Sequence, residues 1–79
     1  MGERIPVTDV PVGASVRVVE VLGGHGMRSR LHSIGIRPGI VVTKVSGFPG
    51  HGPVVLQVGG TQTALGFGVC SRIIGEATL

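Results

Sequence analysis

The sequence predicts an all-β fold, a small barrel of five short strands with one helix between the first and second strands. Val and Ile together supply 20 of the 79 residues, against 5 Leu, and this bias toward β-branched side chains favours strands. The 15 Gly and 5 Pro stand between the apolar runs, as turn residues do in a chain of many short strands. At this length we expect a single domain over residues 1–79, with its core at about residues 7–74.

The helix is predicted immediately before Gly35. Met27, Leu31 and Ile34 have the i, i+4, i+7 spacing of one apolar helical face. Gly35 then occupies the position where a left-handed residue ends a helix, and Leu31 and Ile36 are placed to meet in a Schellman ending. A basic helix of about two turns is therefore expected in an otherwise β chain.

The remaining pattern places the strands and their connections. The apolar alternation slips at Val18 and Val19, which predicts a β-bulge, and Gly59 and Gly60 predict a two-residue hairpin turn. The expected strands are residues 15–22, 40–45, 54–58, 61–65 and 72–74. Residues 1–14 are expected to be a lead-in, 46–52 a mobile loop, 66–71 a single helical turn, and 75–79 a tail.

Composition favours a non-catalytic protein of the cytoplasm. The single Cys70 excludes an intrachain disulfide and suits a reducing compartment. The start of the chain lacks the apolar segment of a signal peptide, and no run approaches the ~20 apolar residues of a membrane span. The four acidic residues are scattered along the chain, so we expect no enzyme active site. The net charge of +3 includes one basic cluster, which comprises Arg28, Arg30 and Arg37.

Metal binding is the first alternative that the residues raise. His25, His32, His51 and Cys70 are the candidate ligands, but no two of them have the short spacing of a preformed zinc site. We therefore interpret the three imidazoles as solvated surface groups. Neither a metal site nor a cofactor is predicted beyond weak Fe(II) or adventitious Zn(II) binding.

One segment carries a family resemblance. Residues 30–39 read Arg-Leu-His-Ser-Ile-Gly-Ile-Arg-Pro-Gly, followed by Gly52-Pro53 and later by Ala64-Leu65. In this pattern the chain resembles the ferrous iron transport protein A family, the FeoA-like domain, over about residues 7–74. The resemblance implies an SH3-like barrel and a small cytosolic accessory of ferrous iron uptake. It further implies docking on the membrane ferrous iron transporter B, with an effect on the assembly or the GTPase activity of that transporter.

The expected partner-binding surface uses the helix and the loop after the second strand. Its candidate residues are Met27, Arg28, Arg30, Leu31, Arg37 and Phe48, because arginine and apolar anchors dominate many interfaces. Such a protein would be peripheral at the inner membrane through its transporter, and exposed strand edges would allow self-association.

Two other functions remain open at this point. A nucleic-acid-binding barrel would use the same arginines, but it is disfavoured because Phe48 and Phe67 are the only aromatic side chains available for stacking. A carrier or sensor of transition metal ions would use the three histidines and Cys70.

Overall fold

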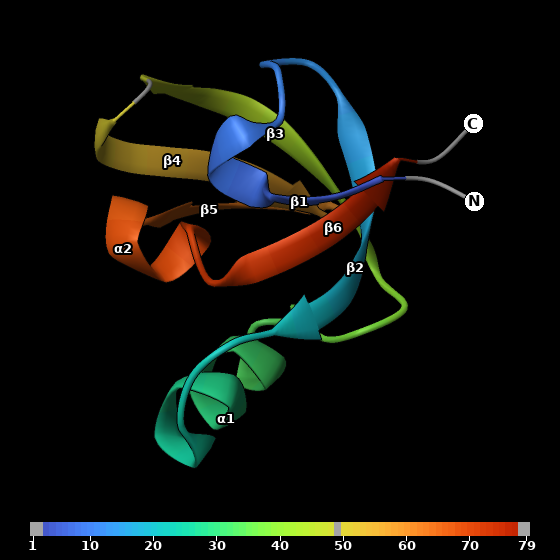
Figure 1. The fold of residues 1–79 in the computed structure, drawn as a ribbon, viewed down its shortest axis with the longest axis vertical. Helices are drawn as coiled ribbons and strands as arrows, with labels where there is room; N and C mark the ends of the chain where they lie inside the picture. Colours follow the sequence, from blue (N-terminus) through green and yellow to red (C-terminus); the bar gives the residue numbers. More distant parts are fainter. Residues whose placement is uncertain (1–2, 49, 78–79) are drawn as a thin grey trace.

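The computed structural model describes residues 3–48 and 50–77, which fold into one six-stranded antiparallel sheet with two short helices and a 3-10 turn (Figure 1). In chain order the elements are β1 (Arg4–Pro6), η1 (Val7–Asp9), β2 (Ser15–Val21), α1 (His25–Ser33), β3 (Val41–Phe48), β4 (His51–Val58), β5 (Thr61–Leu65), α2 (Phe67–Cys70) and β6 (Ile73–Ala77). Neither helix of the described chain is long and apolar enough to cross a bilayer.

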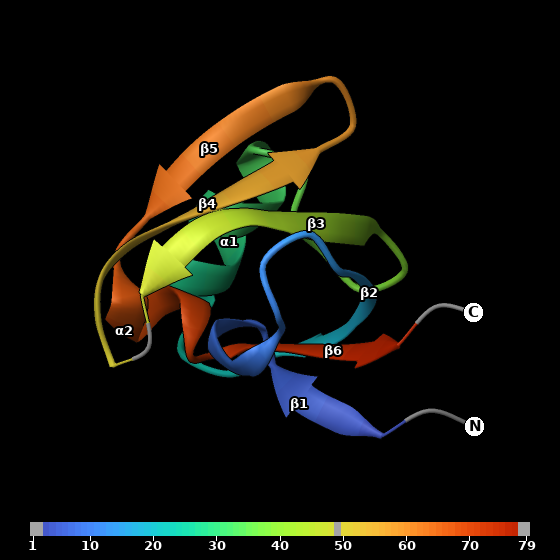
Figure 2. The same ribbon diagram turned by 90° about the horizontal axis from the view of Figure 1, so that it is seen from above.

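The sheet has the strand order β1-β6-β2-β3-β4-β5 and curls into a small barrel (Figure 2). Helix α2 connects β5 to β6, whereas α1 lies at one end of the barrel, next to the end of β2 (Figure 1). The prediction of an all-β small barrel with a helix after its first long strand is therefore confirmed.

The interior of the barrel is filled by alternate residues of the long strands. Val16 and Val18 of β2 and Val54 and Leu56 of β4 are each at most 4 % exposed, because successive side chains of a strand point to opposite faces. Within the described residues, the buried apolar core consists of Val7, Val10, Val16, Val18, Val21, Leu31, Ile36, Val42, Val54, Leu56, Cys70 and Ile73.

The end of α1 is the predicted Schellman motif. The Gly35 N–H donates to the His32 carbonyl at 3.0 Å, and the Ile36 N–H donates to the Leu31 carbonyl at 2.9 Å. Gly35 has a φ of +91°, a backbone conformation that residues with a Cβ rarely adopt. Leu31 and Ile36 are both buried at 1 % exposure, so the helix ending also closes one end of the core.

Two details of the helix prediction are wrong. The helix begins at His25, earlier than the apolar spacing indicated. Ile34 is 39 % exposed, although the spacing placed it on the buried face. It is the C-cap residue, with φ −103° and ψ 14°, so it has left helical geometry and the i+7 relationship no longer holds.

Both predicted irregularities of the strands are present. The register of β2 against β6 shifts between Val18, which pairs with Gly75, and Glu20, which pairs with Ile74. The extra residue is the predicted β-bulge. Residues Gly59 and Gly60 form the hairpin turn between β4 and β5, and the φ of Gly59 is +59°.

The described chain has one more strand than the five that were expected. Residues 4–6, expected as part of a lead-in, form β1 and pair with β6. Residues 75–77, expected as a tail, extend β6. The parts of these two predictions that fall on residues 1–2 and 78–79 lie outside the described residues. Residues 4–6 and 75–77 are strand because they pair with neighbouring strands. Neither segment is long enough to show an apolar alternation of its own.

The mobile loop expected at residues 46–52 is largely strand. Strand β3 continues to Phe48, β4 begins at His51, and these two residues pair across the hairpin. Their rings stack, with centroids 6.1 Å apart and planes inclined by 7°. Position 49 of the predicted loop lies outside the described residues. The helical turn expected at residues 66–71 is present as α2.

Candidate partner-binding surface

The three clustered arginines lie on α1 and on the segment that follows it. Arg28 and Arg30 project from the helix and Arg37 comes two residues after its left-handed glycine, and all three are exposed. Burial of Leu31 fixes the helix against the barrel and thereby directs its other side outward. We call Arg28, Arg30 and Arg37 the α1 arginine surface.

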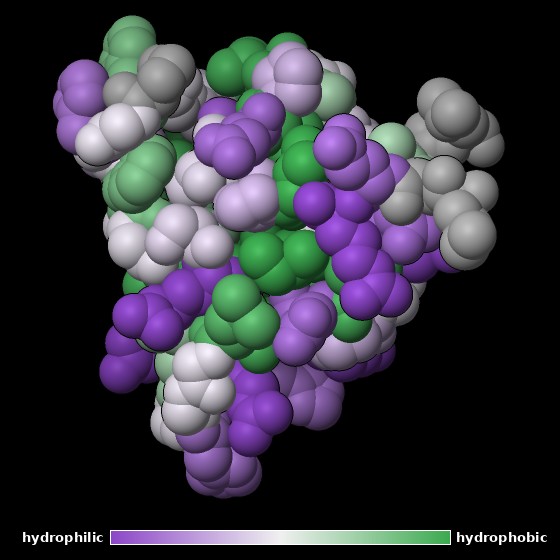
Figure 3. Space-filling model, in the orientation of Figure 1, coloured by the Kyte–Doolittle hydropathy of each residue, from purple (hydrophilic) through white to green (hydrophobic). Residues whose placement is uncertain are grey.

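These arginines have no acidic partner among the residues that the structure describes. Within residues 3–48 and 50–77, the one ion pair joins Arg4 to Glu76 at 3.7 Å. The space-filling view shows hydrophilic side chains over the end of the molecule that carries α1, with hydrophobic side chains above them (Figure 3). An uncompensated positive surface of this kind favours encounters with negatively charged partners.

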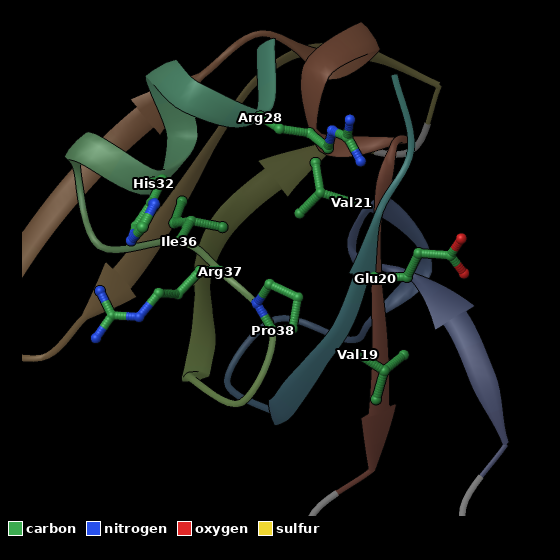
Figure 4. A pocket seen from close by; sticks show the side chains of 8 residues that line it. All are labelled: Val19, Glu20, Val21, Arg28, His32, Ile36, Arg37 and Pro38. Carbon is green, nitrogen blue, oxygen red and sulfur yellow. The ribbon is translucent and has the colours of Figure 1, made fainter. Parts of the chain in front are cut away.

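A cleft separates α1 and its following segment from β2. It encloses about 280 Å³ and is lined by Val19, Glu20, Val21, Arg28, His32, Ile36, Arg37 and Pro38. We call it the α1–β2 cleft. The Arg28 side chain lies beside Val21, whereas His32 and Arg37 lie on the side of Ile36 (Figure 4). The Glu20 carboxylate points away from Arg28, and the Arg37 guanidinium points away from Val21 and Pro38 (Figure 4).

A second, larger groove of about 610 Å³ lies between the end of α1 and strands β3 to β5. Ile34 and Val41 contribute exposed aliphatic side chains to it, at 39 % and 45 %. Its other side includes Thr61 and Thr63 of β5, the strand at one edge of the sheet. Arg37 lines both this groove and the α1–β2 cleft.

The structure does not gather all the residues that were expected to bind a partner. Met27 is half-buried and packs against the core. Leu31 is 1 % exposed, so its inclusion is corrected: it is a core residue that supports the surface without being part of it. Phe48 is 69 % exposed, but its hairpin lies at the end of the molecule opposite α1 (Figure 1).

The four candidate metal ligands also lie apart. His25 and His32 are on α1, His51 is in the β3–β4 hairpin, and Cys70 is buried in α2. Burial raises the pKa of the Cys70 thiol from 9.0 to about 11, while the charge of Lys44 acts in the opposite direction. No three His, Cys, Asp or Glu side chains of the described chain are grouped to hold a metal ion.

Sequence reasoning missed two features near these sites. His32 lines the α1–β2 cleft, and its i, i+4 spacing from Arg28 was the available signal, because such residues share a helix face. Lys44 is 5 % exposed, and its Nζ donates to the Thr8 carbonyl at 2.8 Å. A lysine on the inward face of a strand has no local signal, because the apolar alternation around it predicts an aliphatic residue there.

Together, the curled sheet and its arginine-bearing helix define a small SH3-like β-barrel. The model of the FeoA domain family matches residues 5–77, so the chain belongs to the FeoA domain family and the resemblance seen in the sequence is confirmed. Membership agrees with the expected accessory role in ferrous iron transport.

Solved structures agree with this family. The crystal structure of an iron uptake regulatory protein, FeoA, is 32 % identical, with a TM-score of 0.89, and the match covers 96 % of this chain and all of that one. A Stenotrophomonas maltophilia FeoA complexed with zinc, described as a prokaryotic SH3 domain protein, is 28 % identical with a TM-score of 0.77, over 89 % of this chain and 87 % of that chain.

A FeoA-like protein from Clostridium acetobutylicum is 22 % identical with a TM-score of 0.83, over all of this chain and 92 % of that one. At this identity the likeness concerns the fold alone. A search of curated proteins found no match.

Proposed function

We propose that this protein is a cytoplasmic accessory of ferrous iron uptake that docks on the cytosolic part of the membrane ferrous iron transporter B. Through that contact it modulates the assembly or the GTPase activity of the transporter, and it is peripheral at the membrane only while it is docked. Family membership supports the iron-transport role. The observation that carries the docking part is the α1 arginine surface, whose three side chains are exposed and have no acidic partner among the described residues.

The fold supports an adaptor more than a catalyst. Helix α1 is held rigidly by its buried Leu31 and by the hydrogen bonds of its Schellman ending, so its exposed face is preorganised. A preorganised surface loses less conformational entropy on binding than a flexible loop does. The aliphatic side chains of Ile34 and Val41 beside Arg37 add apolar area to the same end of the molecule.

The nucleic-acid alternative receives little support from the geometry. No aromatic side chain lines either the α1–β2 cleft or the larger groove, whereas single-strand binding relies on stacking against aromatic rings. The metal-carrier alternative would need its ligands to converge, but His25 and His32 lie on α1 and His51 lies in the β3–β4 hairpin.

Co-purification tests the proposal. The tagged chain is incubated with detergent-solubilised membranes of its own cell, beside an R28A/R30A/R37A variant. A matched control, R4A/R17A/R72A, removes the same charge from three exposed arginines that are not part of the α1 arginine surface. We expect the transporter to be retained by the native chain and by the control, and to be lost with the α1 variant.

Circular dichroism of all three proteins first confirms that they are folded. Equal retention by both variants would contradict docking through α1. Failure of the native chain to retain the transporter would contradict the proposed function itself.

A further inference from the structure

We propose that the α1–β2 cleft is a recognition site for a short acidic segment of a protein partner, in which an aliphatic side chain is flanked by carboxylates. The inference deepens the docking function proposed above and rests on it. It specifies the chemistry of the partner segment. Within the α1 arginine surface, Arg28 and Arg37 would bind this segment, and Arg30 would not.

The floor of the cleft is the first argument. Val21 and Ile36 belong to the buried core and present their edges between the cationic side chains, and Pro38 extends this apolar floor outward. Figure 4 shows the three side chains between the ribbons of α1 and β2. An aliphatic side chain placed there would remove apolar surface from water at about 25 cal/mol for each Å² buried.

The distribution of charge is the second argument. Arg28 lies beside Val21, and Arg37 with His32 lies on the other side of the cleft, with the Arg37 guanidinium turned outward at its rim (Figure 4). Glu20, the one acidic residue that lines the cleft, turns its carboxylate away. Two separated guanidinium groups match two carboxylates on different side chains, because each arginine can hold one carboxylate through paired hydrogen bonds.

The volume and the apolar floor of the cleft favour a single inserted side chain. About 280 Å³ lies just below the ~300–1,000 Å³ typical of small-molecule pockets, and it accommodates one inserted side chain. A single phosphate offers no apolar group to cover the floor between Arg28 and Arg37.

Arg30 provides an internal control. It is exposed on the same helix but does not line the cleft. If the surface acted only through its net charge, Arg30 would contribute as much as Arg28. If the cleft recognises a defined segment, Arg28 and Arg37 dominate and Arg30 does not.

The experiment uses a random dodecapeptide display library panned on the immobilised full-length chain, with counter-selection on R28A/R37A. We expect the enriched peptides to carry Leu, Ile or Val flanked by Asp or Glu. In fluorescence anisotropy with a selected peptide, R28A and R37A should each weaken binding about tenfold, the effect of losing one charge-assisted hydrogen-bonded contact. R30A should change the affinity by less than about twofold.

Several outcomes would overturn the inference. They are the absence of enrichment, enrichment of basic or proline-rich peptides, equal weakening by R30A, or displacement of the peptide by a single-stranded oligonucleotide at lower concentration. The measurement contains no transporter, so its result is separate from that of the co-purification. If the cleft selects acidic peptides but the native chain does not retain the transporter, this inference stands and the proposed function is contradicted.

Discussion

The ammonium of Lys44 donates a hydrogen bond to the carbonyl oxygen of Thr8 inside the barrel, and the two residues are only 5 % and 8 % exposed. This bond fastens η1, through Thr8, to β3 at a site where an aliphatic residue would be expected. Lys44 also pairs with Leu56 across the sheet, so its alkyl stem shares the core. The ammonium therefore satisfies a buried carbonyl, as buried polar groups require.

Replacing Lys44 should reveal this role. K44A removes the hydrogen bond and leaves space in the core, so we expect a loss of about 2–4 kcal/mol in unfolding free energy. K44M keeps most of the volume and should cost clearly less, because only the Thr8 carbonyl loses its partner. Urea denaturation of both variants measures the difference, and a K44A protein as stable as the native chain would contradict the assignment.

The pairing of β2 with β6 requires a glycine at position 75. A Cβ built there would lie 2.5 Å from Cγ2 of Val16 and 2.9 Å from its Cβ. We expect G75A to cost about 1–3 kcal/mol, as overpacking of a tight core does. The control is G68A, because a Cβ at Gly68 in α2 would meet nothing within 4 Å. That substitution should be neutral or slightly stabilising in thermal unfolding. Similar melting temperatures for the two variants would refute the argument.

The left-handed end of α1 gives a second contrast between glycines. Gly35 has a φ of +91°, and a Cβ there would lie 3.4 Å from Val58 Cγ1. We expect G35A to destabilise the protein by about 1–2 kcal/mol through backbone strain. G26A lies within the same helix in open space, and it should stabilise by up to ~1 kcal/mol through helix propensity. Denaturant midpoints of the two variants should therefore shift in opposite directions, and shifts of the same sign would count against the helix ending described here.

The buried thiol makes stability depend on alkaline pH. Burial raises the pKa of Cys70 from 9.0 to about 11, so between these values the unfolded chain loses a proton that the folded chain keeps. The unfolded state is thereby favoured as pH rises. We expect the native chain to lose on the order of 2 kcal/mol more stability than C70A between pH 8 and pH 11. If the unfolding free energies of the native chain and C70A change with pH in parallel, the pKa of Cys70 is not raised in the folded state.

The same protonated state should make Cys70 unreactive. The thiolate is the nucleophilic form of cysteine, and a buried structural thiol is inert. At pH 8 we expect the folded protein to react with iodoacetamide at least tenfold more slowly than the urea-unfolded chain, since the pKa is raised to about 11. Mass spectrometry measures both alkylation rates, and equal rates for the folded and the unfolded chain would contradict the buried position of the Cys70 side chain.

Local chemistry made some of these features predictable. The Gly35 helix ending, the bulge after Val18 and the Gly59-Gly60 turn each depend on residues that are neighbours in sequence. Strand β1 was not predictable, because only pairing with β6 makes residues 4–6 a strand. The inward position of Lys44 was also missed, since it depends on a carbonyl 36 residues away in the chain.

Some features of the candidate site could also be predicted from the sequence, and others could not. Arg28, Arg30 and Arg37 were found from their clustering in the sequence. The α1–β2 cleft was not, because its floor unites Val21 of β2 with Ile36 and Pro38, which only the folded chain brings together. Phe48 was expected on the same surface from its exposed loop, yet the barrel places its hairpin at the other end (Figure 1).

The most direct test of the central claim is the affinity between the purified chain and the purified transporter in lipid nanodiscs. The comparison uses R28A/R30A/R37A and its charge-matched control R4A/R17A/R72A. We predict that the α1 variant binds at least tenfold more weakly than the native chain, which corresponds to about 1.4 kcal/mol, while the control changes little. Equal affinities for the two variants, or no measurable binding by the native chain, would contradict the claim that this protein docks on the transporter through its α1 arginine surface.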